Sequence, residues 1–408
     1  MPTLLPMAFD VEKVRARYPA LSDGRSWLDS AGGTQVPQQV IDAVAEVLAR
    51  GVSNVGGDFD SSRRAVSVVA EARAALADLT GAPGPECVVF GPSTTALVYR
   101  FAGVLAAGWR PGDEVVVTEL DHDSNVRPWV QHAQRAGATV RFAPIDPETG
   151  SLPAERVVEL IGERTRLVAV TAASNLVGEV PDVAAITRRA REVGATSFVD
   201  GVQHCPHAEV DVAALGADFY ATSAYKWSGP HLAAVVAADP WSLETLNPDK
   251  LLPSPDEIPT RFELGTAPFE SLAGVTAAVD HLAELDPAAT GTRRERLLAS
   301  RRAVVAHEDR LAALLFDGLA ELPHVRRVGR PAGRCTPIAA FTVPGRAPAE
   351  VAGSLAERGI NVSAGHGYAW QAVRALGLGE EGAVRAALCH YSEEADVRRL
   401  LDALGDLA

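Results

Sequence analysis

The sequence predicts an α/β protein with a mostly parallel sheet between layers of helices, followed by a smaller α+β domain. Three observations lead to this prediction. Between residues 87 and 236, short continuous apolar segments alternate with helical patterns, which is typical of parallel strands buried on both faces. A tail, 337–408, then shows strand and helix character in alternation. The length of 408 residues suggests two or three domains.

The division between the two domains is expected near residue 275. The large domain would extend over residues 21–275 and the small domain over residues 276–408, and the segment 1–20 would pack on the small domain. The charged, amphipathic segment 292–322 is expected to form one long helix that leads into the second unit.

Apolar periodicity and helix-stop residues predict the elements of the large domain. A helix is expected from Thr34 to Gly51, because Pro37 suits its first turn and Gly51 its end. A Gly- and Asp-rich loop, 53–62, follows. Strands are expected at 88–90, 115–117, 167–170, 198–199 and 233–236, and helices at 93–105, 125–136 and 183–193. The Pro-rich segment 240–259 is expected on the surface.

Composition and charge limit the possible partners. Hydrophobic residues make up 47% of the chain, which is enough to bury a substantial core. The net charge of -14 argues against nucleic acid or an anionic membrane as a partner. Backbone amides and hydroxyls can nevertheless hold a phosphate locally. No stretch is long enough to span a membrane and the N-terminus lacks signal-peptide features, so we expect a cytoplasmic protein.

The four cysteines, Cys87, Cys205, Cys335 and Cys389, are far apart in the sequence. None belongs to a C-x-x-C pair or to a His and Cys ligand pattern, so neither a metal site nor a disulfide framework is expected. Cys389 is expected to be a buried strand residue with a structural role.

Ligands bind at the carboxyl ends of strands in such sheets, and several polar groups fall there. They are the hydroxyls of Gly91–Thr95, His122 and Asp200, and Lys226 follows on a short polar turn. Each has an ordinary interpretation when taken alone. Asp200 could cap the next segment, Lys226 could be a solvated charge, Gly91–Thr95 could be a strand-to-helix turn, and His122 could be a satisfied loop histidine.

The combination favours a pyridoxal phosphate (PLP) enzyme. PLP chemistry needs a Lys for the Schiff base and an acid beside the pyridinium nitrogen, which Lys226 and Asp200 would provide. It also needs donors for the phosphate and a surface on which the ring can stack. The hydroxyls near Thr94 and the imidazole of His122 would meet these needs, in the chain order expected of one sheet.

Motifs over nearly the whole chain resemble the class V aminotransferase family of fold type I PLP-dependent enzymes, which includes cysteine desulfurases and isopenicillin N epimerase. The motifs are Leu28-Asp-Ser-Ala31, Thr94-Thr95, His122 with Asn125 and Trp129, Ser174-Asn175 with Gly178, Asp200-Gly-Val-Gln203, Ser223-Ala-Tyr-Lys226, Arg261-Phe-Glu-x-Gly-Thr266 and Arg385-Ala-Ala-Leu. The segments 31–37 and 120–125 resemble a cysteine desulfurase-like subgroup. This resemblance implies a large domain with a seven-stranded sheet.

The resemblance also implies a role for each matching residue. Lys226 would form the Schiff base and move the Cα proton, Asp200 would pair with the pyridine nitrogen, and His122 would stack on the ring. Asn175 and Arg385 would bind the substrate carboxylate. The other cofactor contacts would come from Thr94, Thr95, Gln203, Ser223 and Tyr225, and from Thr266 of a partner subunit. Tyr225 stands where many relatives carry a His, so its contact with the phosphate is the weakest of these inferences.

One departure from the family pattern bears on function. Cysteine desulfurases carry a nucleophilic Cys on a mobile loop, in a Gly-His-His-Cys-Ala type of segment. The matching segment here is Ala364-Gly-His-Gly-Tyr-Ala369, so that Tyr368 stands in place of the Cys. Without a thiolate at this point, persulfide formation has no acceptor. We therefore do not expect a competent cysteine desulfurase.

The reaction expected from these observations is β-elimination on a cysteine-derived or similar amino acid, by analogy with the sulfur-handling relatives. Aminotransfer and epimerisation are the alternatives. Tyr368 and His366 would act as acid or base, or Tyr368 would only cover the pocket. Arg127 and Arg374 are weak candidates for a second carboxylate-binding Arg.

A protein that has kept the fold but lost catalysis is the remaining alternative, and the joint presence of Lys226, Asp200, Gln203 and Arg385 argues against it. The expected partners are a small amino-acid substrate and a second copy of the chain. In that homodimer, Thr266 and the Gly56–Phe59 loop would reach the other subunit's site.

Overall fold

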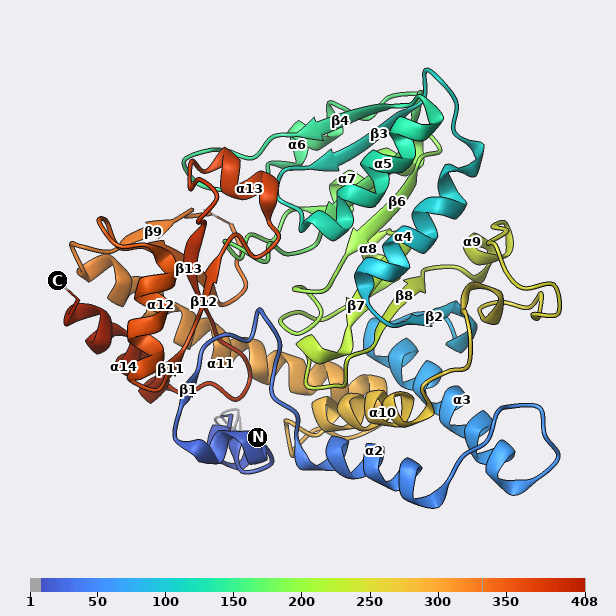
Figure 1. Cartoon of the computed structure of the whole chain (residues 1–408), viewed down its shortest axis with the longest axis horizontal. Helices are drawn as coiled ribbons and strands as arrows, with labels where there is room; N and C mark the ends of the chain where they lie inside the picture. The colour runs from blue at the N-terminus through green and yellow to red at the C-terminus, as the bar shows by residue number, and fades with distance from the viewer. Residues whose placement is uncertain (1–8, 332, 408) are drawn as a thin grey trace, which may run out of the picture.

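The computed structural model describes residues 9–331 and 333–407. Its chain forms two units, each built around its own sheet (Figure 1). One unit holds a seven-stranded sheet with the order β2-β8-β7-β6-β5-β3-β4, and the other holds a four-stranded sheet with the order β12-β13-β10-β9. This is the predicted α/β architecture with a smaller α+β unit.

The large sheet is parallel except at one strand. Strand β8 runs antiparallel to β2 and β7, and all other neighbours are parallel. The strands are β2 (Val88–Gly91), β3 (Glu114–Thr118), β4 (Thr139–Ala143), β5 (Thr165–Thr171), β6 (Thr196–Asp200), β7 (Phe219–Ser223) and β8 (Ala233–Ala237). The carboxyl ends of β5, β6 and β7 therefore meet at one edge, where open α/β sheets bind ligands.

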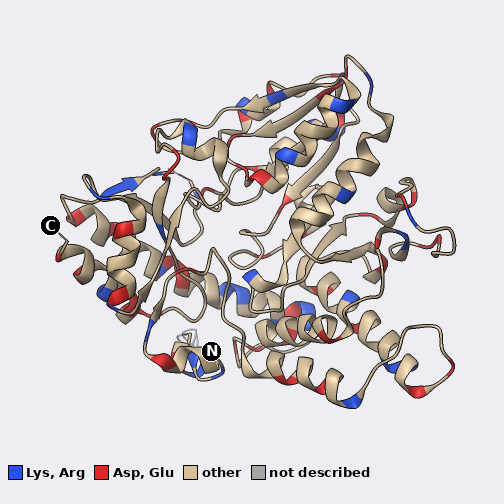
Figure 2. Ribbon diagram, viewed as in Figure 1, with Lys and Arg blue, Asp and Glu red and all other residues tan. Residues whose placement is uncertain are grey.

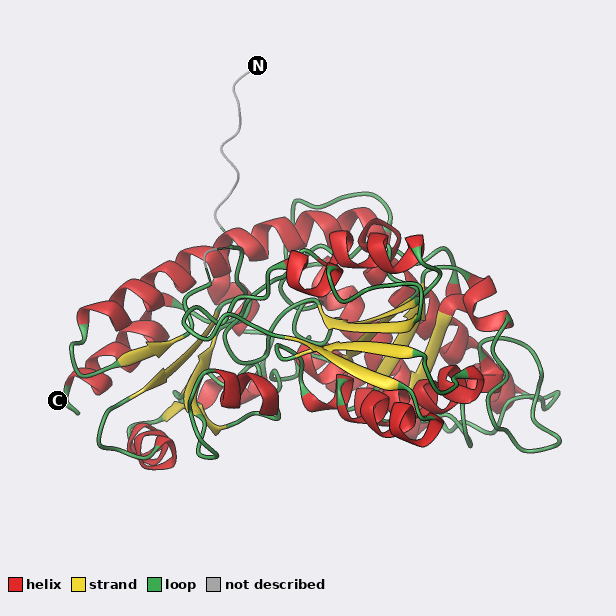
Figure 3. Cartoon of the chain, turned by 90° about the horizontal axis from the view of Figure 1, so that it is seen from above, coloured by secondary structure: helices red, strands yellow, loops and turns green. Residues whose placement is uncertain are grey.

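Successive residues of each central strand point to opposite faces of the sheet. Phe198 of β6 belongs to one hydrophobic cluster and Val199 to another, and Val235 and Val236 of β8 divide in the same way. Because both faces are covered by helices, these strands have continuous apolar sequences rather than alternating ones. Figure 3 shows the helices on both sides of the strands.

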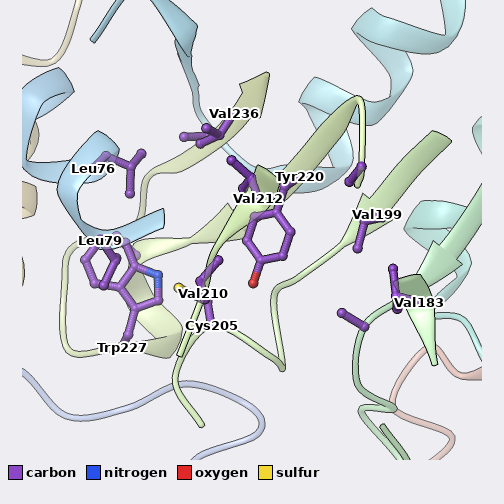
Figure 4. Packing of buried hydrophobic residues seen from close by; sticks show 14 of the residues in the cluster. Leu76, Leu79, Val183, Val199, Cys205, Val210, Val212, Tyr220, Trp227 and Val236 are labelled. Atoms are coloured by element: carbon purple, nitrogen blue, oxygen red, sulfur yellow. The ribbon is translucent and has the colours of Figure 1, made fainter. Parts of the chain in front are cut away.

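Different helices cover the two faces. Helices α4 (Thr94–Leu105) and α5 (Arg127–Ala136) supply Phe101 and Trp129 to one cluster. On the other face, Leu76 and Leu79 of α3 (Asp60–Thr80) pack near Trp227 and Val236 (Figure 4). The same face is covered by α7 (Val183–Glu192) and α10 (Phe269–Ala283).

The second unit is an antiparallel sheet with helices. Its strands are β9 (Arg326–Val328), β10 (Ile338–Thr342), β12 (Ser363–Gly365) and β13 (Ala383–Ala387). Its helices are α12 (Pro348–Glu357), α13 (Trp370–Ala375) and α14 (Glu394–Gly405). A short strand near the N-terminus, β1 (Ser26–Trp27), pairs in parallel with β11 (Ile360–Asn361) and so ties the start of the chain to this unit.

The expected domain boundary at residue 275 falls inside α10, which is continuous from Phe269 to Ala283 and packs on α3 and on α2 (Gln38–Arg50). We therefore propose that the division lies in the segment 284–292. The predicted long helix is α11 (Arg293–Glu321), which contacts α3 and α10 in one unit and α14, β9 and β10 in the other.

The described part of the N-terminal segment lies against the second unit. Helix α1 (Val11–Arg15) ends with Arg15, whose guanidinium donates to the carbonyl of Tyr391 at 2.8 Å and to Asp396 of α14 at 3.1 Å. The ring of Phe9 lies 4.8 Å from the ring of His307 on α11. Residues 1–8 of this expected segment lie outside the described residues.

Several expected boundaries were wrong. Helix α2 starts at Gln38, because Pro37 is in an extended conformation and precedes the helix instead of lying within it. Helix α3 starts at Asp60, inside the expected loop, and β4 and β7 were not expected at all. Cys389 is buried, but it lies beyond the end of β13. Short helices also occur at α6 (Ala154–Val158), α8 (Val212–Leu215) and α9 (Pro240–Glu244), the last within the Pro-rich segment.

Charged residues are spread over both units. Lys and Arg are intermingled with Asp and Glu over the described chain (Figure 2). No helix in the ranges 9–331 and 333–407 is long and apolar enough to cross a lipid bilayer. The same residues contain no group of three or more His, Cys, Asp or Glu side chains suited to hold a metal ion.

Candidate active site

A cavity of about 650 Å³ opens at the carboxyl ends of β5, β6 and β7. Loops of the large unit and two segments of the small unit, at Tyr368 and Arg385, line it. It brings together most of the residues that the sequence predicted, namely Thr94, Thr95, His122, Asn175, Asp200, Gln203, Ser223, Tyr225, Lys226, Tyr368 and Arg385. His366 and Thr266 are not among the residues that line it.

One end of the cavity is formed by the N-terminus of α4. Ser93 caps this helix, and its hydroxyl accepts a hydrogen bond from the amide of Ala96. The hydroxyls of Thr94 and Ser223 lie 2.7 Å apart and are both buried. The first amides of a helix lack intrahelical partners and carry a partial positive charge, so this end suits a phosphate.

Lys226 lies at the end of a single 3-10 turn that follows β7. Its ammonium donates to the carbonyl of Ala31 at 2.5 Å and lies 4.8 Å from the ring centre of Tyr225. Burial, with help from the positive charge of Arg385, lowers the pKa of Lys226 to about 7, and Asp200 acts in the opposite direction. The amine is therefore neutral in a large fraction of molecules at neutral pH.

Asp200 is the last residue of β6 and is buried in the cavity wall. Its carboxylate accepts the amide of Val202 at 2.9 Å. Burial raises the pKa of Asp200 to about 6, against the lowering effects of that hydrogen bond and of Lys226. Nearby, the amide of Gln203 donates to the carbonyl of Ala31 at 2.8 Å, so that one carbonyl receives both Gln203 and Lys226.

His122 is presented by a hydrogen-bonded turn after β3. Its Nδ1 lies 2.7 Å from the hydroxyl of Ser124 and accepts a hydrogen bond from the backbone amide of Ser124 at 3.1 Å. Burial, followed by the charges of Lys226 and Arg385, lowers the pKa of His122 to about 4. The imidazole is therefore neutral at physiological pH and available for stacking.

A buried network below His122 holds this turn. Asp121 accepts from Asn125 at 2.7 Å and contacts the hydroxyl of Thr118, and the indole of Trp129 donates to Asn125 at 3.1 Å. Burial raises the pKa of Asp121 to about 8, and the nearby Asp200 adds to the effect. Asp121 is thus protonated at neutral pH, a role that its position in the sequence did not indicate.

Arg385 and Asn175 form the opposite end of the cavity. The guanidinium of Arg385, on β13, donates to the backbone carbonyl of Asn175 at 2.5 Å. The side-chain amide of Asn175 donates to the carbonyl of Gly367 at 2.7 Å, whereas its oxygen is buried and has no partner among the described residues. Burial lowers the pKa of Arg385 to about 10, which leaves it cationic. A carboxylate is the group that this end of the cavity accepts best.

The loop that carries Tyr368 closes one side of the cavity. Tyr368 has a φ of 58° and remains 66% exposed, and its ring centre lies 5.4 Å from that of His122. The Nδ1 of His366 accepts the amide of Tyr368 at 2.9 Å, and its ring packs edge-on against Trp370. His366 therefore stabilises the conformation of this loop, and its part in catalysis stays a prediction.

Other lining residues were not expected. They are Ala31, Tyr99, Asp123, Ser124, Thr171, Ala173 and Val202. Gly32, Ser93 and Gly367, from the motif segments 31–37, 91–95 and 364–369, also line the cavity, as does Arg127, a candidate for a second carboxylate-binding Arg. A helix N-terminus at Arg127, four residues after Asp123, is the sequence pattern that could have revealed the charged pair described below.

The sequence pattern of the family described as Aminotransferase class-V matches residues 26–400. The chain belongs to this family. Among relatives of this class V protein, an uncharacterized protein of Mycobacterium tuberculosis is 36% identical and covers 98% of this chain and 100% of its own length. A probable cysteine desulfurase of Pseudomonas aeruginosa is 35% identical over 96% of each chain. The solved structure of the cysteine desulfurase CsdA from Escherichia coli superimposes with a TM-score of 0.85, at 28% identity over 98% of each chain.

This class V enzyme uses pyridoxal phosphate, and the cavity fits that cofactor. Its volume of about 650 Å³ lies in the range of small-molecule sites. A helix N-terminus with two facing hydroxyls suits the phosphate, and a largely neutral buried Lys suits the aldehyde. An unpartnered buried oxygen on Asn175 also indicates that a polar ligand completes this site.

Proposed function

We propose that this enzyme catalyses β-elimination on an L-amino acid with a sulfur substituent at Cβ. Its substrate and water would give a thiol, ammonia and a keto acid. Bound PLP supplies an electron-withdrawing ring that is conjugated with the substrate's amine. The single observation that carries the proposal is the chemistry of the cavity wall, which Tyr368 lines and no cysteine lines.

The environments of the four cysteines argue against persulfide chemistry. None of them lines the cavity, and Cys87, Cys205 and Cys389 are buried. Burial raises the pKa of Cys87 and of Cys335 to about 11, and that of Cys389 to about 12. The site therefore offers no cysteine thiolate that could attack the sulfur of the substrate. The C–S bond would instead break by departure of the substrate's own sulfur as a thiolate leaving group.

The chain's own groups suit the remaining tasks. Arg385 and Asn175 would bind the α-carboxylate and fix the orientation of Cα. Lys226, with its pKa near 7, would take the Cα proton, because a base works best when its pKa is close to the working pH. Asp200, largely ionised above its pKa of about 6, would keep the ring nitrogen protonated, while the neutral His122 would cover the ring.

Tyr368 is the residue that we assign to the leaving group. Its phenol is carried by the cavity-lining loop, and its ring centre lies 5.4 Å from that of His122, the residue that would cover the cofactor ring. A hydroxyl there can donate a proton to the departing thiolate, so that the sulfur leaves as a thiol. The alternative is that Tyr368 only covers the cavity, which Tyr368→Phe would still do.

We also propose a homodimer. Thr266 is exposed on its own subunit and does not line its own cavity, which is consistent with a contact in a partner's site. Large apolar side chains are also exposed on α2, on α3, on the loop between them and on the segment 251–264, namely Ile41, Leu48, Val55, Phe59, Val66, Leu251, Leu252 and Leu264. An exposed set of this kind favours burial against a second copy.

The test is an assay of the purified holoenzyme with S-propyl-L-cysteine, L-cysteine and L-alanine. Elimination predicts that thiol, ammonia and keto acid accumulate in equal amounts without an added keto acid, and that the cofactor spectrum is restored. A requirement for an added keto acid would instead indicate aminotransfer, and exchange of the Cα hydrogen with inversion would indicate epimerisation. Either result would contradict the proposal.

Tyr368→Phe distinguishes the two roles of the tyrosine. If the phenol donates the proton, this variant loses about tenfold or more in kcat, since general acid catalysis contributes roughly 10²–10⁴-fold. The loss should shrink with a substrate whose leaving thiol is more acidic. An unchanged kcat with both substrates would mean that Tyr368 only covers the cavity.

A further inference from the structure

An ion pair lines the cavity beside the Tyr368 loop, and no part of the proposed reaction uses it. Arg127, the first residue of α5, approaches the carboxylate of Asp123 with Nη2 at 3.1 Å and Nε at 3.4 Å. Both residues line the cavity and both are partly exposed, with side-chain exposures of 38% and 28%. Their charged ends can therefore meet a ligand.

The loop fixes where this pair lies relative to the substrate. The carbonyl of Gly367 accepts from Asn175, and a Cβ on Gly367 would lie 3.1 Å from Nη1 of Arg385. The carbonyl of the next residue, Tyr368, accepts from the amide of Asp123 at 2.8 Å. Consecutive Cα atoms are about 3.8 Å apart. Two adjacent residues of the loop, Gly367 and Tyr368, therefore connect the carboxylate end of the cavity with the backbone of Asp123.

A substrate that lies along this loop has its α-carboxylate at Arg385 and its side chain directed toward Asp123 and Arg127. This orientation rests on the proposed function, in which Arg385 and Asn175 bind the α-carboxylate. A substrate side chain of a few atoms is then long enough to reach Asp123 and Arg127. The charges of these two residues decide which substrates bind.

Each charge of the pair offers a partner to one charge of a ligand. A side chain with a carboxylate alone would be attracted by Arg127 and repelled by Asp123, and a side chain with an ammonium alone would meet the reverse. A neutral side chain gains from neither. Only a group that carries both an ammonium and a carboxylate can match both residues, each through charge-assisted hydrogen bonds.

We propose that Asp123 and Arg127 form a specificity site for a substrate whose side chain ends in a second amino-acid head group. The ammonium of that head group contacts Asp123 and its carboxylate contacts Arg127. The substrate class is thus two amino-acid units joined through a sulfur-containing linker.

The test compares four S-substituted L-cysteines of similar length with the holoenzyme. They are L-cystathionine (both charges), S-(2-carboxyethyl)-L-cysteine (negative), S-(2-aminoethyl)-L-cysteine (positive) and S-propyl-L-cysteine (neutral). Binding is measured from the change in cofactor absorbance, and products are measured separately. L-Cystathionine is expected to bind about tenfold tighter than each of the other three.

Two variants and a control test the residues. In Arg127→Gln, L-cystathionine should no longer bind more tightly than the aminoethyl compound. In Asp123→Asn, it should no longer bind more tightly than the carboxyethyl compound. Arg374→Gln serves as the control, because Arg374 is exposed on α13 and does not line the cavity. This control should keep the full preference.

The outcomes separate this inference from the proposed reaction. Preferred binding of L-cystathionine without release of ammonia and keto acid would sustain the specificity site and contradict the elimination. Elimination with equal affinity for all four compounds would support the proposed reaction and contradict the specificity site. The inference is also overturned if the preference for L-cystathionine survives in both Arg127→Gln and Asp123→Asn.

Discussion

Opposing influences act on the amine of Lys226. Desolvation and the positive charge of Arg385 favour the neutral form, and Asp200 favours the charged form. The sum places the pKa near 7, about three units below that of an ordinary Lys. Because only a neutral amine can attack the cofactor's aldehyde or take a proton, this lowered pKa suits both tasks that we propose for Lys226.

This balance predicts the pH dependence of Lys226 acylation in the cofactor-free protein. The chain has three lysines, Lys13, Lys226 and Lys250, so a pulse of acetic anhydride read by mass spectrometry follows each one. Reaction of Lys226, scaled to its own plateau, should rise with a midpoint near pH 7. Lys13, whose pKa is raised by its hydrogen bond with Asp10, should react only at much higher pH.

Two variants should shift this midpoint in opposite directions. Asp200→Asn removes a charge that raises the pKa of Lys226, so its midpoint should fall, whereas Arg385→Gln should raise it. A wild-type midpoint above pH 9, or shifts of the same sign in the two variants, would contradict this electrostatic account.

Asp121 gives a second prediction at this scale. One of its oxygens contacts the hydroxyl of Thr118 and the other accepts from the side-chain amide of Asn125. Because a hydroxyl can either donate or accept, the contact with Thr118 is compatible with a protonated Asp121. Asp121→Asn can make the same two contacts, so it should be tolerated, whereas Asp121→Ala leaves buried polar groups unpaired and should cost about 1–3 kcal/mol. Chemical denaturation of the three proteins measures the difference.

The pH dependence of that stability has a definite sign. The folded protein keeps the Asp121 proton up to about pH 8, and the unfolded chain releases it near the ordinary value of 3.8. Between these values the folded state binds more protons, so wild-type stability should fall relative to Asp121→Asn as pH rises from about 4 to 8. A constant difference over this range would mean that Asp121 is ionised in the fold.

At the level of elements, the α4 N-terminus, the turn after β3 and the Tyr368 loop each present one part of the site. The Tyr368 loop depends on a close backbone contact. A Cβ added to Gly382, just before β13, would lie 2.2 Å from the carbonyl oxygen of Gly365 on β12. Gly382 also has a φ of 68°. No side chain fits there without moving the strand that leads into the loop.

Gly382→Ala should therefore destabilise the protein and displace Tyr368. We expect a loss of about 2–4 kcal/mol in the free energy of unfolding, together with reduced turnover. Gly379→Ala is the matched control, because Gly379 has a φ of 67° but nothing within 4 Å of its Cβ position. That variant should show only the backbone strain, about 1–2 kcal/mol. Equal effects of the two substitutions would exclude the contact with Gly365 as the cause.

Elements differ in how well the sequence predicted them, and the reason is physical. Strands β3, β5 and β8 were predicted, since burial on both faces gives them continuous apolar sequences. Strand β7 was missed, because Thr222 and Ser223 make its buried end polar. The edge strand β4 was missed because its residues are partly exposed and mixed in character.

The site shows the same division. Motif residues such as Lys226 and Asp200 were predicted to share a site, and the fold brings them into one cavity. The place of Asp123 and Arg127 beside the cavity could not be predicted from their own segment. It depends on a contact between Asp123 and the loop at Tyr368, which lies more than two hundred positions later in the chain. His366 was expected in the cavity because of its place in the loop motif, but it is not among the lining residues, and its Nδ1 accepts the amide of Tyr368 within the loop.

At the scale of the whole molecule, residues of both units line the cavity. The end that we assign to the phosphate lies at α4, and the end that we assign to the carboxylate combines Asn175 of the large unit with Arg385 of the small unit. Helix α11 contacts elements of both units and so couples them. Thr266 is the one predicted cofactor contact that a single subunit does not bring to the cavity. A site completed by a second copy would explain this.

Mixed dimers test whether Thr266 acts across subunits. Lys226→Ala removes the amine of its own site, and Thr266→Val removes a hydroxyl that would serve the partner's site. A dimer of one Lys226→Ala subunit and one Thr266→Val subunit would contain one intact site, because the Lys of one subunit meets the Thr of the other. Equal amounts, unfolded and refolded together, should recover about a quarter of wild-type activity.

The control mixes Lys226→Ala with a protein that carries both substitutions, and it should remain inactive because neither subunit supplies the amine. If Thr266 serves only its own subunit, the first mixture should not exceed the mean of its two components. Sedimentation of the wild-type protein supplies the independent measurement. A fully active monomer would exclude a shared site, and it would leave the exposed apolar residues on α2 and at Leu251 and Leu252 without the partner that we propose.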